Sequence, residues 1–267
     1  MRKLTLTLLT LMIALPTFYG VAGRAQSCGD TLLADTTLTA SLTCTGSGLI
    51  VGADDITLDC ANFTITGSGT DIGILLDGRT GVTVENCTAI NFTIGFLLTG
   101  SPSNYLTSNG AVNNTSSGSG AFQLSSGSDG NVLEGNRSSN NAGRGFAVID
   151  STGNMLIDNA ATANGFRGFD LIDATGNALV LNIASQNTSA GVVVQGTSEG
   201  NILYRNRMIG NLSEGVATFS SVNYLSFNRA NGNSTFGFTD FTGANFYLLN
   251  GCVGNTLGPS NPAGLCP

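Results

Sequence analysis

The sequence predicts an all-β protein whose chain winds into a single-stranded parallel β-helix of roughly ten turns, each of about 22–25 residues. Two observations carry this prediction: a triplet of asparagines recurs at a nearly fixed period, and short alternating apolar segments lie between the triplets. A fixed period in the twenties is typical of a solenoid, in which each repeat packs only against its neighbours. We expect the right-handed form, because parallel crossovers are strongly biased to that hand.

The asparagines of each triplet are five residues apart, and from Asn131 onward successive triplets are offset by 22 to 24 residues. In a stack of turns, equivalent residues lie about 4.8 Å apart, so each side-chain amide can bond the amides above and below it in a ladder. Asn also tolerates the left-handed backbone that sharp corners require. The triplets are Asn104/Asn109/Asn114, Asn131/Asn136/Asn141, Asn154/Asn159/Asn164, Asn177/Asn182/Asn187, Asn201/Asn206/Asn211, Asn223/Asn228/Asn233 and Asn245/Asn250/Asn255.

Between the asparagines, apolar residues alternate over three or four positions, as in Phe146/Val148 and Phe169/Leu171. Gly, Asn and Ser separate these segments, which favours three short strands per turn, joined by tight corners. No window offers the run of helix formers that a helical repeat needs. A pentapeptide-repeat solenoid is the main rival, but its five-residue rhythm would have to run uninterrupted, and here it breaks once per turn.

Residues 1–25 are predicted to be a secretory signal peptide, because Arg2 and Lys3 precede an apolar run and small residues follow it. The apolar run is too short for a comfortable membrane span. We therefore expect a secreted, periplasmic or cell-surface protein, with retention of the segment as an anchor as the alternative. Residues 26–267 then form one β-helix domain, with an N-terminal cap and first turn over 28–60 and a C-terminal cap over 252–266.

Without residues 1–25, seven arginines stand against 17 acidic residues, which gives a net charge of −10 with no lysine and no histidine. Such a surface repels nucleic acid and anionic membranes, so neither is expected as a partner. It also disfavours bare polyuronates unless a cation such as calcium intervenes. We expect a monomer with no cofactor, calcium being the one candidate ion.

Six cysteines in an exported chain predict three disulfides, for which fifteen pairings are open in principle. Two pairs each flank a terminal segment, and a third occupies nearly equivalent places in consecutive turns, where "DITLDCANF" aligns with "GVTVENCTA". Stacked strands hold Cα atoms within disulfide reach. Buried free thiols are the alternative. The favoured pairs are Cys28–Cys44, Cys60–Cys87 and Cys252–Cys266.

The segment "GLIVGADDITLDCANFTITG", residues 48–67, resembles the opening turn of bacterial right-handed parallel β-helix repeat proteins. That broad group includes NosD-type periplasmic proteins and is related in fold to pectate lyases. The next turn, "GILLDGRTGVTVENCTAINFTIGF", continues the resemblance. Cys60 to Phe63 depart from the family's pattern, in which Leu, Asn, Gly and His are usual. The resemblance implies the fold but no particular activity, since this solenoid carries lyases, hydrolases, epimerases and adhesins.

Aligning the turns at their glycines gathers one set of residues suited to chemistry. In this alignment, two arginines stack at one end of the strand and two aspartates stack at the other. A further aspartate occupies an outward strand position, and two phenylalanines lie at the end of an outward apolar stripe. Stacked carboxylates about 5 Å apart suit a retaining glycosidase or a calcium ion, and aromatic rings beside acids suit sugars. The candidate ligand-binding residues are Arg144, Arg167, Asp150, Asp173, Asp170, Phe219 and Phe241.

Two classes of function follow. The leading hypothesis is an exported, non-catalytic solenoid that binds carbohydrate or serves as a surface structural element. The alternative is a polysaccharide-modifying enzyme, a lyase or C5-epimerase, acting at the Asp170 face with Arg144 or Arg167. A metal site of the NosD type favours His or Met ligands, and only Met155 and Met208 remain after the signal, so no metal ligand and no catalytic residue is assigned. In a purely structural interpretation, the charged residues decorate turns and a loop covers the stripe.

Overall fold

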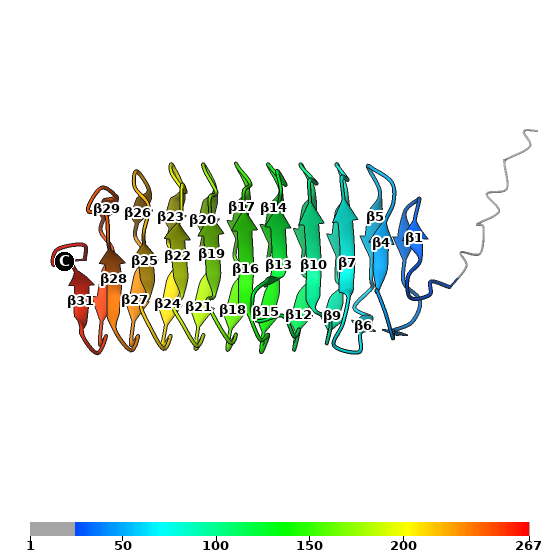
Figure 1. The fold of residues 1–267 in the computed structure, drawn as a ribbon, viewed down its shortest axis with the longest axis horizontal. Helices are drawn as coiled ribbons and strands as arrows, with labels where there is room; N and C mark the ends of the chain where they lie inside the picture. Colours follow the sequence, from blue (N-terminus) through cyan, green and yellow to red (C-terminus); the bar gives the residue numbers. More distant parts are fainter. Residues whose placement is uncertain (1–24, 267) are drawn as a thin grey trace, which may run out of the picture.

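The structure, a computed structural model, describes residues 25–266, which form an all-β parallel solenoid of about ten turns (Figure 1). These residues contain 31 strands and no helix, and therefore no helix that could span a membrane. The N-terminal and C-terminal turns lie at opposite ends of the long axis (Figure 1). The predicted β-helix is thus confirmed, while the predicted signal peptide lies, except for Ala25, outside the described residues.

Successive strands belong to three different sheets, so three strands make one turn, and every pair of neighbours within a sheet is parallel. Sheet A consists of β1 (Thr31–Leu32), β4 (Leu49–Val51), β7 (Ile72–Asp77), β10 (Ile94–Thr99), β13 (Gly120–Ser125), β16 (Arg144–Ile149), β19 (Phe169–Ile172), β22 (Val192–Gln195), β25 (Val216–Thr218), β28 (Phe236–Asp240) and β31 (Gly258–Asn261).

The other two sheets are built from shorter strands. Sheet B consists of β2 (Thr36–Thr37), β5 (Thr57–Asp59), β8 (Thr83–Glu85), β11 (Tyr105–Thr107), β14 (Val132–Glu134), β17 (Met155–Ile157), β20 (Ala178–Val180), β23 (Ile202–Tyr204), β26 (Tyr224–Ser226) and β29 (Phe246–Leu248). Sheet C consists of β3 (Leu42–Thr43), β6 (Thr64–Thr66), β9 (Thr88–Ile90), β12 (Gly110–Val112), β15 (Arg137–Ser139), β18 (Ala160–Thr162), β21 (Ile183–Ser185), β24 (Arg207–Ile209), β27 (Arg229–Asn231) and β30 (Gly251–Val253).

The core is a linear stack of apolar side chains, because alternate residues of every strand point inward. Its clearest column comes from sheet A, where four phenylalanine rings stack with centroids 4.5–4.9 Å apart and are at most 1% exposed. Burying one such side chain contributes roughly 1.5–3 kcal/mol. The rings belong to Phe96, Phe122, Phe146 and Phe169.

The three asparagine columns form the predicted ladders along the corners of the solenoid. Asn159 is representative: its backbone N–H and its Nδ2 both donate to Oδ1 of Asn182, at 2.9 and 3.1 Å, and Nδ2 also donates to the carbonyl of Leu133 at 2.8 Å. Its own Oδ1 accepts from Asn136 in the same way. The ladders therefore satisfy buried corner amides that no sheet can reach.

The reason expected for asparagine at the corners is in part wrong. The left-handed backbone falls on the residue just before every ladder asparagine except Asn245, as at Asp158 (φ 51°), Leu181 (φ 60°) and Arg205 (φ 56°). No ladder asparagine among the described residues has a positive φ. Asparagine is thus used here for its side-chain amide and not for its backbone tolerance.

A glycine repeats near the start of the sheet A strands because neighbouring turns approach too closely there for a side chain. A Cβ added at Gly145 would lie 2.6 Å from the carbonyl oxygen of Gly168, and one added at Gly168 would lie 2.5 Å from that of Gly191. Real Cβ atoms do not approach backbone so closely. Glycine is therefore required at this position, because any side chain would clash with the next turn.

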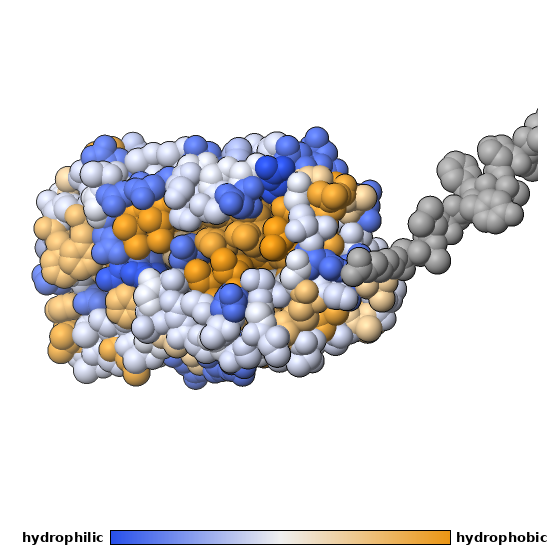
Figure 2. Space-filling model, turned by 45° about the vertical axis from the view of Figure 1, so that its right-hand side comes forward, coloured by the Kyte–Doolittle hydropathy of each residue, from blue (hydrophilic) through white to orange (hydrophobic). Residues whose placement is uncertain are grey.

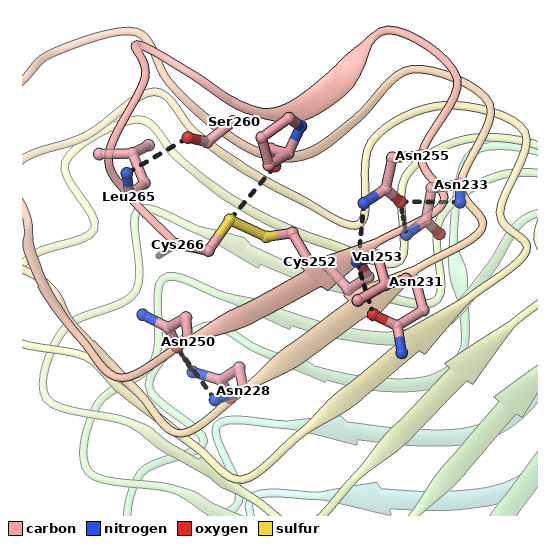
Figure 3. Close-up of a disulfide and its surroundings, with 12 residues drawn as sticks. Asn228, Asn231, Asn233, Asn250, Cys252, Val253, Asn255, Ser260, Leu265 and Cys266 are labelled. Carbon is pink, nitrogen blue, oxygen red and sulfur yellow. Dashed lines mark hydrogen bonds between the residues drawn. A yellow bond between two sulfur atoms is a disulfide. The ribbon is translucent and has the colours of Figure 1, made fainter.

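Three disulfides join the predicted pairs, and the described residues contain no free cysteine. Cys60 and Cys87, the pair that joins two consecutive turns, have their Cα atoms 4.7 Å apart. Figure 3 shows the last pair, Cys252–Cys266, which ties the C-terminal segment back to β30 beside the ends of the ladders. Each solenoid end exposes an unpaired turn, so the terminal pairs staple the edges that most need protection.

Candidate functional site

Asp170 lies at the centre of β19, between two side chains of the core, Phe169 and Leu171. Alternation along the strand directs Asp170 to the outer side of sheet A, where its register neighbours are Ala147 and Val193. Its side chain is nevertheless fully buried, with 0% exposed surface. The expectation that Asp170 is open on this face is therefore wrong, because alternation tells which side of the sheet a residue faces but not what covers it.

Two arginines and a glutamine cover Asp170. Arg144 donates from Nε to Oδ2, Arg167 donates from a terminal nitrogen to the same oxygen at 2.7 Å, and Gln195 Nε2 donates to Oδ1 at 3.0 Å. The two arginine side chains are only 14% and 16% exposed. The predicted stacking of Arg144 and Arg167 is thus realised, but both charges are directed at the carboxylate beneath them.

A ring and a loop that the sequence analysis did not single out complete the cover. Arg144 also donates to the carbonyl of Gly118 in the loop between β12 and β13, and the Phe166 ring lies 5.2 Å from the Arg144 guanidinium carbon and 4.6 Å from that of Arg167. Charged, hydrogen-bonded pairs that are shielded from water hold their geometry strongly. Phe166 has no counterpart in neighbouring turns, so periodicity gave no signal for it.

Asp150 and Asp173 lie at the opposite ends of the same strands, in the turns that follow β16 and β19. Both are exposed and have a left-handed backbone, with φ of 47° and 51°. Asp173 accepts hydrogen bonds from the backbone N–H and the hydroxyl of Thr197, at 2.8 and 3.0 Å. These contacts are those of turn residues, and the strand separates both carboxylates from the arginines.

The outer face of sheet A is largely apolar. Figure 2 shows a hydrophobic band lying in a hollow along the solenoid between more polar ridges. The outward positions supply half-buried apolar side chains, among them Leu75, Leu97 and, in the next column, Ile149 and Ile172. Towards the C-terminal end, the column that begins with Leu75 and Leu97 continues in the small, buried side chains of Val193 and Ala217. These two residues cluster with Ala190.

The second outward column ends in an exposed aromatic pair. Phe219 and Phe241 stack with their ring centroids 4.3 Å apart and their planes 8° from parallel, and they are 46% and 59% exposed. No loop covers them, in contrast to Asp170. Their rings offer a flat apolar surface in the same column as Ile149 and Ile172, from which Gln195 separates them.

Metal-binding side chains do not gather anywhere in residues 25–266, which contain no group of three or more His, Cys, Asp or Glu suited to a metal ion. All six cysteines are in disulfides, and the sequence has no histidine. Met208 is fully buried in the core, and Met155 is exposed on β17 with no second soft ligand beside it. The donor set therefore suits neither copper nor zinc.

Comparison with known proteins gives a match to a family by sequence and matches to solved structures by fold. The sequence model of the family described as "Periplasmic copper-binding protein (NosD)" matches residues 37–251. No curated protein matches the chain. Among solved structures, a mutant of the periplasmic alginate epimerase AlgG superimposes with a TM-score of 0.62 at 16% identity, covering 84% of this chain and 71% of that one.

Two further structures show the same architecture. The Azotobacter vinelandii mannuronan C-5 epimerase AlgE6 A-module has a TM-score of 0.58 at 14% identity, over 90% of this chain and 83% of that one. The catalytic unit of a thermostable GH87 α-1,3-glucanase from Streptomyces thermodiastaticus has a TM-score of 0.62 at 12% identity, over 88% of this chain and 59% of that one. At such identities the likeness shows the fold alone.

Proposed function

This chain belongs to the NosD family, and from that premise we propose that it is an exported β-helix protein that binds a polysaccharide without transforming it. The periplasm in the family's description and three disulfides support export to an oxidising compartment, the periplasm or the cell surface. The copper in that description does not fit the donors of this chain, so copper has no part in the proposal.

The observation that carries the proposal is the exposed, stacked pair of Phe219 and Phe241 at the end of the apolar band on sheet A. Sugar rings have apolar faces that pack on aromatic rings, and a row of such contacts along a solenoid suits an extended chain of sugars. The structural neighbours are named for action on alginate and on α-1,3-glucan, which supports polysaccharide as the class of ligand.

The absence of catalysis is proposed from the state of Asp170. A general base must accept a proton from the substrate, so it needs a free lone pair within hydrogen-bond reach of it. The side chain of Asp170 has no exposed surface, and Arg144, Arg167 and Gln195 donate to its two oxygens from above, so a substrate cannot reach its remaining lone pair. The remaining predicted acids, Asp150 and Asp173, lie in exposed turns away from the arginines.

The test removes the aromatic pair. We expect Phe219→Ala/Phe241→Ala to weaken glycan binding about tenfold or more, measured by calorimetry against neutral oligosaccharides. The chain offers a matched control in Tyr224 and Phe246 on sheet B, which also stack, with centroids 4.9 Å apart, and are 46% and 55% exposed. Equal losses in the Tyr224→Ala/Phe246→Ala variant would show that binding does not depend specifically on the aromatic pair of sheet A, and would refute the proposed site.

The alternative function is a polysaccharide lyase or C5-epimerase. The observation in its favour is that the cluster of Arg144, Arg167 and Asp170 lies on the same outer face of sheet A as the apolar band. Turnover is detected as new double bonds, inverted C5 centres or new reducing ends. If the wild-type protein turns over a polysaccharide and the Asp170→Asn variant does not, the protein is an enzyme, and the proposal of non-catalytic binding is refuted.

A further inference from the structure

A hollow of about 740 Å³ lies on the outer face of sheet C near the C-terminal end of the solenoid, on a different sheet from the aromatic pair of Phe219 and Phe241. Two columns of side chains line it over three consecutive turns. One column is the first residue of β24, β27 and β30, which are register neighbours, and the other is the corner two residues earlier. Turn by turn, the lining residues are Arg205 and Arg207, Phe227 and Arg229, and Leu249 and Gly251.

This hollow concentrates positive charge in an acidic protein. The described residues carry seven arginines, no lysine and 17 acids, and three of the arginines line this one hollow. Elsewhere, Arg79, Arg144 and Arg167 are ion-paired with aspartates. Within residues 25–266, no ion pair and no side-chain hydrogen bond engages Arg205, Arg207 or Arg229; Arg205 only stacks on Tyr204, at 5.0 Å.

The pairing of Arg207 with Arg229 is unfavourable unless something neutralises it. Both are exposed and directly adjacent in register on neighbouring strands. Like charges facing each other across strands destabilise a sheet, and a turn rise of about 4.8 Å holds the two side chains close. An anion between the guanidinium groups would convert this repulsion into two charge-assisted hydrogen-bonded contacts.

The corner residues of the hollow take a conformation that their side chains do not favour. Arg205, Phe227 and Leu249 have φ of 56°, 56° and 52°, and the same corner holds Gly135, Asp158 and Leu181 in earlier turns. Bulky residues with positive φ therefore begin at Leu181, one turn before the hollow, and continue through it. At this corner the side chains project outward to form one wall of the hollow, and Phe227 is 41% exposed.

Gly251 keeps the hollow open above Arg229. A Cβ added there would meet only Cγ of Arg229, at 3.9 Å, which is ordinary contact, and the backbone of Gly251 does not have a positive φ. The backbone therefore does not require glycine at this position. What glycine provides is free space beside an unpaired guanidinium group.

We propose that this hollow binds a negatively charged sugar unit, whose carboxylate lies between Arg207 and Arg229 and whose apolar ring face packs on Phe227. Guanidinium groups match a carboxylate bidentately, and an aromatic ring supplies the complementary platform. The volume lies within the range of small-ligand sites. This site goes beyond the binding proposed for sheet A and stands on separate residues.

The acidic surface restricts the ligand to a short one. The described residues carry a net charge of −10, so the surface away from the hollow repels a long polyanion, and the local field favours a single uronate or the end of a glycan chain. In this hollow, three unpaired arginines oppose the repulsion of bare uronates that the acidic surface produces.

The test measures binding of a galacturonic acid trimer, its carboxyl-reduced neutral counterpart and a sulfated trimer to the exported protein by calorimetry. We expect the uronate trimer to bind most tightly and more weakly as salt rises. Arg207→Ala/Arg229→Ala is expected to lower its affinity about tenfold or more. Gly251→Leu, which keeps all three charges but fills the hollow, is expected to weaken binding as well.

Arg137→Ala is the matched control, because Arg137 occupies the same outward column of sheet C, is exposed and unpaired among the described residues, and lies outside the hollow. It should leave the affinity unchanged. Equal affinity for the neutral and the uronate trimer would overturn the proposal, and so would an equal loss of affinity in Arg137→Ala. Tighter binding of the sulfated trimer would refute the claim that the site recognises a carboxylate. Phe219→Ala/Phe241→Ala should not affect trimer binding here, so failure of either site is distinguishable from failure of the other.

Discussion

At the scale of single residues, burial decides what a charged side chain can do. Asp170 and Asp173 belong to the same turn and differ by three positions, yet Asp170 is sealed under two arginines while Asp173 caps an exposed turn. Removing one partner of a buried ion pair leaves the others uncompensated, which costs more than the net value of the pair. We therefore expect the ion-paired cluster of Arg144, Arg167 and Asp170, called the clasp below, to have a structural role and to hold the loop at Gly118 in place.

Asp170→Asn tests this clasp. The substitution preserves shape but leaves Arg144 and Arg167 without a counter-charge, so we expect a loss of about 2–4 kcal/mol in the free energy of unfolding by urea, toward the lower end because both arginines keep some contact with water. Asp150→Asn, at an exposed turn that tolerates asparagine, should change stability by less than about 0.5 kcal/mol. Equal effects of the two substitutions would show that the clasp contributes nothing.

What the sequence could reveal about residues depended on periodicity. Arg207 and Arg229 each follow a ladder asparagine directly, so their shared column could be read from the spacing. The hollow they line could not, because it also depends on a missing side chain at Gly251 and on corner side chains that project outward. The cover over Asp170 includes Phe166 and the loop at Gly118. Each of these occurs in a single turn, so the periodic pattern of the sequence does not predict them.

At the scale of elements, the asparagine ladders hold the corners together where the sheets end. Ladder spacing was fully visible in the sequence, since each column needs the same residue at the same place in every turn. The strands of sheets B and C are only two or three residues long. Such strands have little cross-strand contact of their own, so the corner amides supply much of what keeps the register fixed.

Asn159→Asp is the sharpest probe of a ladder. It keeps the size of the side chain but removes both donors of Nδ2 and sets a carboxylate oxygen against Oδ1 of Asn182 and the carbonyl of Leu133. We expect a loss of about 3 kcal/mol or more in unfolding free energy. Asn140→Asp, at an exposed turn with a left-handed backbone, is the control and should be nearly neutral. A small effect at Asn159 would refute a structural role for the ladder.

The last turns contain a buried carboxylate that couples stability to pH. Burial disfavours the ionised form of Asp240, but hydrogen bonds from Thr242 (hydroxyl and backbone N–H), Gly243 N–H and Asn245 Nδ2 outweigh this and hold its pKa below the ordinary value of an aspartate. A lowered folded-state pKa stabilises the protein above the unfolded-state pKa. That stabilisation is lost as pH falls below about 4.

Asp240→Asn should therefore flatten the dependence of unfolding free energy on pH between about 5 and 3, while lowering stability at neutral pH. Urea midpoints measured at successive pH values, with Asp150→Asn alongside to show the contribution of an exposed acid, provide the comparison. Parallel curves for wild type and Asp240→Asn would contradict the role assigned to these hydrogen bonds.

At the scale of the whole molecule, the solenoid separates scaffold from surface. Ladders and stacked phenylalanines specify the fold and repeat along the axis, which is why the architecture could be predicted as a whole, and terminal disulfides close its two ends. The candidate ligand surfaces break the repeat instead. The aromatic pair on sheet A and the arginine hollow on sheet C both lie towards the C-terminal end, where outward positions change from small or aliphatic to aromatic and charged.

The central claim is that this protein holds a polysaccharide and leaves it unchanged. The measurement that tests it most directly is nuclear magnetic resonance of neutral and uronate oligosaccharides incubated with the exported protein, which reports binding and chemical change in one sample. The account predicts perturbed sugar resonances for at least one oligosaccharide, lost in Phe219→Ala/Phe241→Ala, with the covalent structure intact after prolonged incubation. New double bonds, inverted C5 centres or new reducing ends that depend on Asp170 would contradict it, as would the absence of binding to every oligosaccharide.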